Sequence, residues 1–176
     1  MALSVVTTLA GCAAPQARVT ALAETLARHA SATAALEEWC RQNRFAETPR
    51  IAAHRLPATG ETVAEARQHL RLSADAPLGI RHVELVCGTR VLSVAHNVFD
   101  PALLTPAMNA ALANSDTPFG KVVAPLGFTR ETLDTRRGGE PGCPAGTVLS
   151  QVALLRLPGG RPLAFLTECY TRAAVE

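Results

Sequence analysis

The sequence is poor in aromatic residues, since one Trp, one Tyr and five Phe make up only 4% of its 176 residues. Its basic residues form no run, and the formal net charge is only +2. Proteins that recognise nucleic acids typically combine a clustered basic surface with stacking aromatic side chains. The sequence therefore disfavours a nucleic-acid partner.

Several other signatures are missing as well. No apolar run has the length needed to span a bilayer. There is no C-x-x-C pair, and the five histidines show no ligand spacing, so the sequence indicates no metal site. The G-x-S-x-G motif is absent, which leaves an α/β-hydrolase without support.

Five cysteines are present: Cys12, Cys40, Cys87, Cys143 and Cys169. Because five is odd, they cannot all pair within one chain. Cys87 and Cys169 lie in strand patterns and are predicted to be buried, acting as small hydrophobic residues. Cys143 lies in a loop rich in glycine and proline, where its thiol is either inert or reactive.

Residues 1–17 carry no charged side chain. Leu9–Cys12 reads LAGC and resembles the lipobox of bacterial lipoproteins, in which Cys12 would carry a lipid anchor. An export signal requires Lys or Arg before its apolar stretch, and this sequence has neither there. We expect residues 1–17 to be either the remnant of an export signal or a disordered or docked segment, and residues 18–176 to form one domain.

Hydrophobic residues make up 48% of the chain and charged residues 18%, as in a globular domain. Apolar periodicity predicts two helices in 16–43, another ending at Leu70, and two that begin at Asp100-Pro101 and Thr105-Pro106. Strands are predicted at 49–57, 128–136, 148–157 and 161–170, with a hairpin over 78–100 that turns near Gly88. This order indicates an α+β fold with an antiparallel sheet.

Two charged residues lie on apolar strand faces. Arg81 shares its face with Val83 and Leu85, and Glu168 shares its face with Ala164 and Leu166. A buried unpaired charge is costly, so each requires a partner. Either the two residues pair with each other, or they bracket a small polar ligand, with Arg81 binding a carboxylate and Glu168 meeting an oxygen at its far end.

The chain resembles chorismate pyruvate-lyase between about Ser31 and Tyr170. The resemblance is carried by IRHVELVC (80–87), VLSVAHNVF (91–99), DTPFG (116–120), LGFTRETLD (126–134) and GRPLAFLTECY (160–170). It implies a sheet of about six strands with helices on one face and helical flaps over a buried site. Effector-binding domains of bacterial transcription regulators share this fold.

The resemblance also implies a set of site residues. Arg81 and Glu168 are the implied catalytic residues; Arg81 would grip the carboxylate, assisted by the backbone amide of Phe119 in its turn with Gly120. Glu168 would contact the ring hydroxyl. Ala32 stands in the first flap, where the family often has methionine, and leaves that wall less bulky.

Two functions are therefore expected. The first is a lyase that converts chorismate to 4-hydroxybenzoate and pyruvate without cofactor or metal. The second is a binding protein for a small aromatic or carboxylic acid, exported or lipid-anchored at Cys12. In both cases we expect a monomer without a membrane span, in the cytoplasm for the lyase and in the periplasm or on a membrane for the exported protein.

Overall fold

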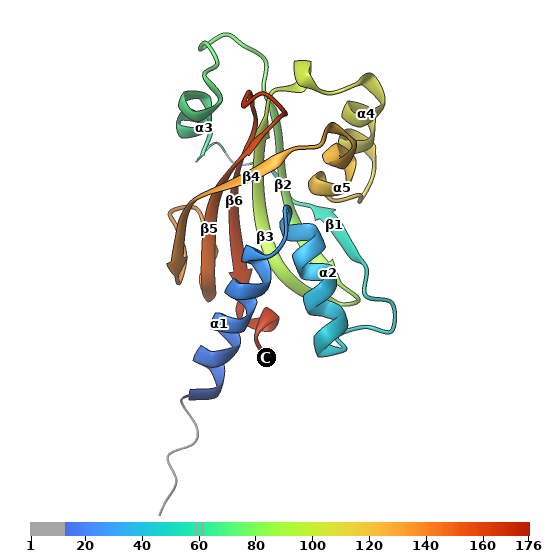
Figure 1. Cartoon of the computed structure of the whole chain (residues 1–176), viewed down its shortest axis with the longest axis vertical. Coiled ribbons are helices and arrows are strands. Elements are labelled where there is room, and N and C mark those ends of the chain that lie inside the picture. The colour runs from blue at the N-terminus through green and yellow to red at the C-terminus, as the bar shows by residue number, and fades with distance from the viewer. Residues whose placement is uncertain (1–12, 59, 61) are drawn as a thin grey trace, which may run out of the picture.

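The computed structural model describes residues 13–58, 60 and 62–176 (Figure 1). Its centre is one six-stranded antiparallel sheet with the strand order β1-β2-β3-β6-β5-β4. The strands are β1 (Ile51–Arg55), β2 (Gly79–Cys87), β3 (Arg90–Phe99), β4 (Thr129–Arg137), β5 (Thr147–Arg156) and β6 (Pro162–Thr171). The predicted α+β fold with about six antiparallel strands is confirmed.

Within the described residues, five α-helices pack around the sheet: α1 (Ala13–Ala27), α2 (Ala32–Asn43), α3 (Val63–Leu70), α4 (Pro106–Asn114) and α5 (Phe119–Val123). Three short 3-10 helices complete the fold: η1 (Pro101–Leu103), η2 (Ala124–Leu126) and η3 (Arg172–Ala174). The helix starts predicted at Asp100 and Thr105 are present, and both side chains accept a hydrogen bond from a backbone amide in the first turn that follows. Ser31 caps α2 in the same way.

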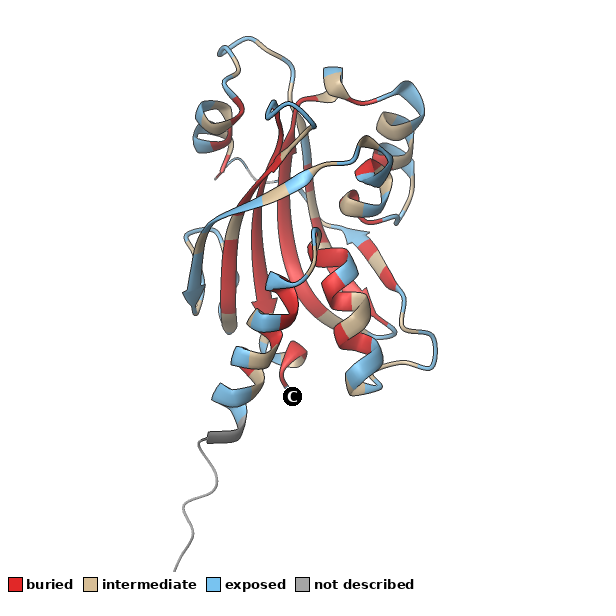
Figure 2. Cartoon of the chain, in the orientation of Figure 1, coloured by how far each residue is buried: buried red, intermediate tan, exposed pale blue. Residues whose placement is uncertain are grey.

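The helices cover both faces of the sheet. On one face α1, α2, α4 and α5 pack over two apolar clusters, and this face carries the odd-numbered side chains of the end of β3, such as Asn97 and Phe99. On the other face α3 contributes Ala66 and Leu70, which pack against Val98 of β3 and Phe165 of β6. The central strands β3 and β6 are consequently almost wholly buried (Figure 2).

The hairpin that opens this core turns at Gly88, as predicted. Gly88 has φ +61°, a left-handed conformation that glycine adopts without the steric cost a Cβ would bring. It joins β2 and β3 as an antiparallel pair, and an irregularity between Leu85 and Val86 shifts their register so that Arg81 lies opposite Asn97. The turn and this shift together fix which residues of the two strands are paired.

The cysteines differ from the sequence-based expectation. Cys40 of α2 is disulfide-bonded to Cys87 of β2, and Cys143 is bonded to Cys169 of β6, with Cα–Cα distances of 6.3 and 5.6 Å. The prediction that Cys87 and Cys169 are simply small buried hydrophobic residues was wrong. Pairs separated by 47 and 26 residues leave no spacing pattern that identifies them.

The Leu9–Cys12 motif lies outside the described residues, and residues 13–17 of the expected N-terminal segment form the start of α1. Among the helices of the described part, none is long and apolar enough to cross a membrane. The division at residue 17 stays a prediction.

Candidate functional site

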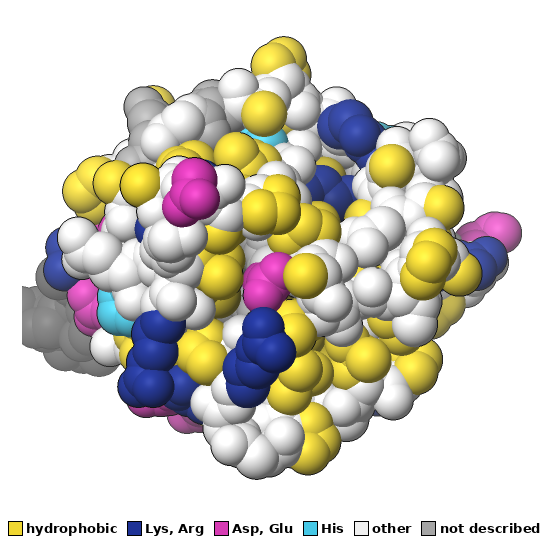
Figure 3. Space-filling model, turned by 90° about the horizontal axis from the view of Figure 1, so that it is seen from above, with side chains coloured by type: hydrophobic (Ala, Val, Ile, Leu, Met, Phe, Trp, Pro, Cys, Tyr) yellow, Lys and Arg dark blue, Asp and Glu magenta, His cyan; other side chains and the backbone are white. Residues whose placement is uncertain are grey.

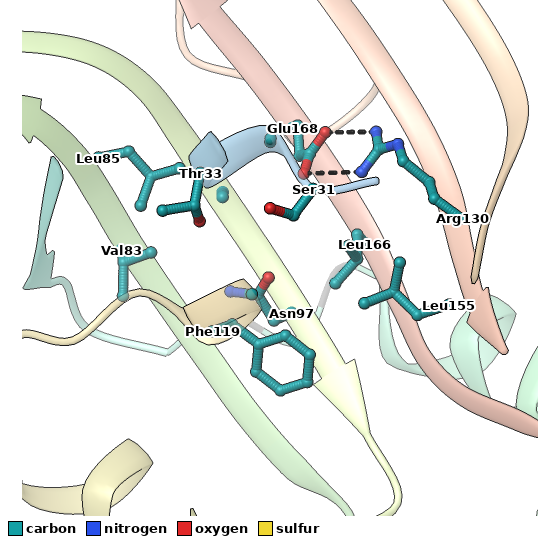
Figure 4. A pocket seen from close by; sticks show the side chains of 13 residues that line it. Ser31, Thr33, Val83, Leu85, Asn97, Phe119, Arg130, Leu155, Leu166 and Glu168 are labelled. Carbon is teal, nitrogen blue, oxygen red and sulfur yellow. Dashed lines mark hydrogen bonds and ion pairs between the residues drawn. The ribbon is translucent and has the colours of Figure 1, made fainter. Parts of the chain in front are cut away.

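A cavity lies between the sheet and the N-terminal ends of α2 and α5 (Figure 4). Its walls combine aliphatic and aromatic side chains with a few polar groups: Ser31, Ala32, Thr33, Val83, Leu85, Ala95, Asn97, Phe119, Gly120, Arg130, Leu155, Leu166 and Glu168. The free space at its centre is about 20 Å³, room for about one water molecule. A larger guest requires the walls to move apart.

Four of the five predicted site residues line this cavity: Ala32, Phe119, Gly120 and Glu168. They arrive from α2, α5 and β6, which are distant in the sequence. The fifth, Arg81, is not among the lining residues. The structure thus brings together most of the set that the resemblance implied, while the roles of these residues stay predictions.

Glu168 is paired with Arg130 of β4. Arg130 donates two hydrogen bonds, from Nη1 to Oε1 at 3.2 Å and from Nη2 to Oε2 at 2.6 Å. The Tyr170 hydroxyl donates a hydrogen bond to Glu168 Oε2 at 2.9 Å. The amide oxygen Oε1 of Gln151 accepts a hydrogen bond from Arg130 Nη2 at 3.1 Å. The Arg130 and Glu168 side chains are only 7% and 4% exposed, so the pair is buried within a satisfied network.

The network shifts the protonation equilibria of its members. Burial raises the pKa of Tyr170 well above its usual range, and the neighbouring charge of Glu168 adds to this effect. Burial alone would lower the pKa of Arg130, but Glu168 and Tyr170 outweigh it and raise that pKa. Arg130 therefore remains a cation at the cavity wall.

Arg81 has a different environment from the one expected. Its guanidinium donates to the carbonyl oxygens of Thr117 at 2.7 Å and Ser115 at 2.8 Å, so its partners are backbone groups rather than a carboxylate. Burial lowers the pKa of Arg81, and the charge of Arg55 lowers it further, against the opposing effect of Asp116. Glu168 pairs with Arg130, so the expected alternative of an Arg81–Glu168 pair is not what the structure shows.

Arg81 and Arg55 together hold the segment that leads into α5. Arg55 donates to the carbonyl oxygens of Leu112 and Ala113 at the end of α4, at 2.8 and 2.6 Å. Arg81 binds the next part of the segment, through the carbonyl oxygens of Ser115 and Thr117. Cationic donors suit the last carbonyls of a helix, which carry partial negative charge. The two arginines thereby position Phe119 and Gly120 at the cavity.

Gly120 sets how closely α5 approaches α2. A Cβ at this position would lie 3.0 Å from Ser31 Cβ and 3.3 Å from Thr33 Oγ1, closer than side chains normally pack. Lys121 forms an ion pair with Glu37 across the same two helices. The backbone amides of Phe119 and Gly120 donate to no acceptor among the described residues, so two donors at this wall are unused.

Arg130 is the site residue that sequence reasoning missed. It lies in the segment TRETLDTRR, which carries charges of both signs and whose residues are mostly exposed. The residues around Arg130 therefore do not predict that its side chain is buried. A bulge between Thr132 and Asp134 further shifts the pairing of β4 with β5.

The fold is found in solved structures of bacterial regulators. The effector domain of PhnF from Mycobacterium smegmatis aligns with a TM-score of 0.51 and 12% identity, covering 81% of this chain and 88% of that one. A GntR-family transcriptional regulator from Enterococcus faecalis aligns with a TM-score of 0.50 and 10% identity, covering 68% and 93%. The chain spans 58% of the length of YydK from Bacillus subtilis, another structure it matches. At these identities the likeness establishes the fold alone.

No family model matches the chain. A curated protein does: the chain is 32% identical to "Uncharacterized protein y4mC" of Sinorhizobium fredii over 192 aligned positions, which cover 92% of this chain and 79% of that protein. The chain belongs to the family of y4mC.

Replacing Arg130 with Met should lower the free energy of unfolding by about 3–5 kcal/mol, because it leaves Glu168 buried without its cation. Urea denaturation measures this loss. The double variant Arg130→Met/Glu168→Leu removes both charges and should recover most of the stability. Wild-type stability in the single variant would show that the pair is not buried as described.

The single tyrosine of the chain allows a direct test of the network by ultraviolet absorbance. We expect no tyrosinate in the folded protein near pH 10, and its prompt appearance on unfolding, because burial and Glu168 raise the pKa of Tyr170. Below about pH 10 Tyr170 is protonated in both states, and above it only the unfolded chain ionises. Stability should therefore fall as the pH rises above about 10.

Tyr170→Phe is the control for this alkaline loss. It should show a smaller decrease in unfolding free energy between about pH 9 and pH 11, since it has no phenol to ionise. Titration of Tyr170 near its ordinary pKa in the folded wild-type protein would contradict the account.

Proposed function

We propose that this protein binds a small carboxylic acid with an aromatic or similarly flat apolar body in the cavity between β3, β6, α2 and α5. The observation that carries the proposal is the composition of the cavity. Aliphatic and aromatic walls, among them Val83, Leu155 and Phe119, separate unused backbone amides at α5 from the Arg130–Glu168 pair. Ligand sites typically combine apolar walls with a few convergent polar groups.

The two polar ends suit the two ends of such an acid. The unused amides of Phe119 and Gly120 are donors for a carboxylate, as the resemblance implies for Phe119. At the other end Glu168 Oε1 accepts only one hydrogen bond, so it can accept a second from a ligand hydroxyl. Arg81 would act indirectly, by holding the turn that presents the amides.

Ligand entry requires the walls to separate, because the free space holds about one water molecule. We expect α5 and α2 to separate at Gly120 and Ser31. No covalent bond joins the helices there, and the contact consists of van der Waals packing and one exposed ion pair. The far end of α2 is fixed to β2 by the Cys40–Cys87 disulfide. We infer that the N-terminal end of α2 moves.

A second candidate function is chorismate lysis, which is supported by the presence of Glu168, Phe119, Gly120 and Ala32 in one cavity. Elimination of enolpyruvate requires a proton for the departing ether oxygen. Glu168 accepts hydrogen bonds from Arg130 and Tyr170, an arrangement that suits a carboxylate rather than a proton donor. Binding without turnover therefore fits the geometry better.

The disulfides also favour the exported form of the binding protein. Four of the five cysteines are paired, and disulfides persist mainly in oxidising compartments. We propose that the full chain is exported and anchored through Cys12. Fractionation of cells that express it should place the protein, with oxidised disulfides, in the membrane fraction, and Cys12→Ser should release it. Recovery of the wild-type chain in the cytosol with reduced cysteines would refute this.

The ligand proposal is tested with 4-hydroxybenzoate and chorismate. A ligand specific to the folded state at 100 times its Kd stabilises that state by about 2.7 kcal/mol, so 4-hydroxybenzoate should raise the melting temperature by several degrees. Gly120→Ala, which wedges α5 away from α2, should reduce this rise. Chorismate should bind without release of aromatic product; release above the uncatalysed rate would favour the lyase, and absence of any shift would reject the proposed function.

A further inference from the structure

The cavity contains one buried polar side chain, that of Asn97, whose presence the fold does not explain. Asn97 projects from the C-terminal part of β3 into the space between Val83 and Leu166 (Figure 4), and only 5% of its surface is exposed. Most of its neighbours on this wall are apolar. Besides the two ends of the cavity already described, Ser31 and Thr33 also line it, and neither side chain donates a hydrogen bond to Asn97. A buried amide in such surroundings is costly unless its hydrogen bonds are made.

Only one of those hydrogen bonds is made within the described part of the chain. Asn97 Nδ2 donates to the carbonyl oxygen of Arg81 at 3.4 Å, a long contact. The oxygen Oδ1 accepts none. Oδ1 is not among the fully buried side-chain oxygens and nitrogens that lack a hydrogen-bond partner. It therefore keeps some accessible surface, which we place on the cavity side.

The orientation of the amide follows from the same contact. Exchanging the nitrogen and oxygen would set Oδ1 against the carbonyl oxygen of Arg81, two acceptors facing each other. The amide therefore presents its acceptor to the cavity. What it lacks is a hydrogen-bond donor, which a hydroxyl or amine of a guest molecule would supply.

We infer that Asn97 determines ligand specificity. It accepts a hydrogen bond from a hydroxyl attached to the apolar body of the ligand, between the carboxylate and the end that faces Glu168. This inference rests on the proposed function and narrows the ligand class to hydroxylated acids that carry such a group in addition to any hydroxyl facing Glu168. In Figure 4 Asn97 lies between Phe119 and the Arg130–Glu168 pair, so it meets the middle of a bound acid rather than either end. In a benzoate this corresponds to the 3-position.

The matched probes are 4-hydroxybenzoate and 3,4-dihydroxybenzoate, which differ by that one hydroxyl. The wild-type protein should bind the dihydroxy acid about fivefold to tenfold more tightly, the ordinary contribution of one added hydrogen bond. Asn97→Val removes the acceptor and leaves a slightly smaller apolar side chain, so the two affinities should become equal within about twofold. Isothermal titration calorimetry measures both ratios.

Leu166→Val is the control, because Leu166 is the register partner of Asn97 on β6 and lines the same cavity without hydrogen bonds from its side chain. It should change both affinities alike and keep their ratio. The melting temperature of unliganded Asn97→Val should equal or exceed that of the wild type, since the variant removes an unmatched acceptor.

The outcomes separate this inference from the proposed function. A preserved ratio in Asn97→Val, or a loss of several degrees in its melting temperature, overturns the specificity role, the latter by showing that Asn97 is structural. A wild-type protein that binds 4-hydroxybenzoate but does not prefer the dihydroxy acid also overturns it, with the proposed function intact. If the wild type binds neither acid, the proposed function fails and this inference fails with it.

Discussion

The burial of the Arg130–Glu168 pair is the constraint on which the site depends. Removing two ions from water costs several kcal/mol for each, and mutual attraction offsets this only when the geometry is good and the remaining hydrogen bonds are made. Here the two-point contact, Tyr170 and Gln151 meet that condition. The network needs β4, β5 and β6 in one register, so the charged edge strand β4 is held to the sheet by the residue that also lines the cavity.

The opposite wall depends on two further arginines, the buried Arg81 and the exposed Arg55. Arg55 and Arg81 bind backbone carbonyls between the end of α4 and Pro118, and the chain then turns into α5 with its first amides at the cavity. Basic side chains on the face seen in Figure 3 are scattered among apolar and neutral ones rather than gathered in a patch. The polar groups proposed to bind a ligand lie inside the molecule, where the dielectric is low and a few polar groups have large effects.

Local signals made much of this structure predictable from the sequence. Alternation identified the hairpin around Gly88, cap signals identified the helix starts at Asp100 and Thr105, and a lone carboxylate among apolar neighbours identified Glu168. What stayed hidden depends on contacts between distant segments. The two disulfides follow no spacing rule, α5 is too short for periodicity, and the partners of Arg81 are backbone carbonyls that no side-chain pattern reveals.

Arg130 shows the same limit in its sharpest form. The polar composition of β4 predicts an exposed strand, and the burial of the Arg130 side chain becomes visible only when the folded sheet brings Glu168 of β6 beside it. The sequence identified one end of the cavity through Glu168, but it assigned the cation to Arg81. Arg81 is buried, as its apolar strand predicts, but it binds backbone carbonyls and does not line the cavity. Burial of a charge is a property of the assembled sheet rather than of the strand that carries it.

The central claim is that this cavity holds a small carboxylic acid between the α5 amides and the Arg130–Glu168 pair. A crystal structure with bound 3-bromo-4-hydroxybenzoate tests it most directly, because anomalous scattering locates the bromine independently of any model. The account predicts bromine inside the cavity, the carboxylate within hydrogen-bond distance of the amides of Phe119 and Gly120, and the hydroxyl toward Glu168. Bromine found outside this cavity, for example in the groove between α3 and residues 140–142, would contradict it.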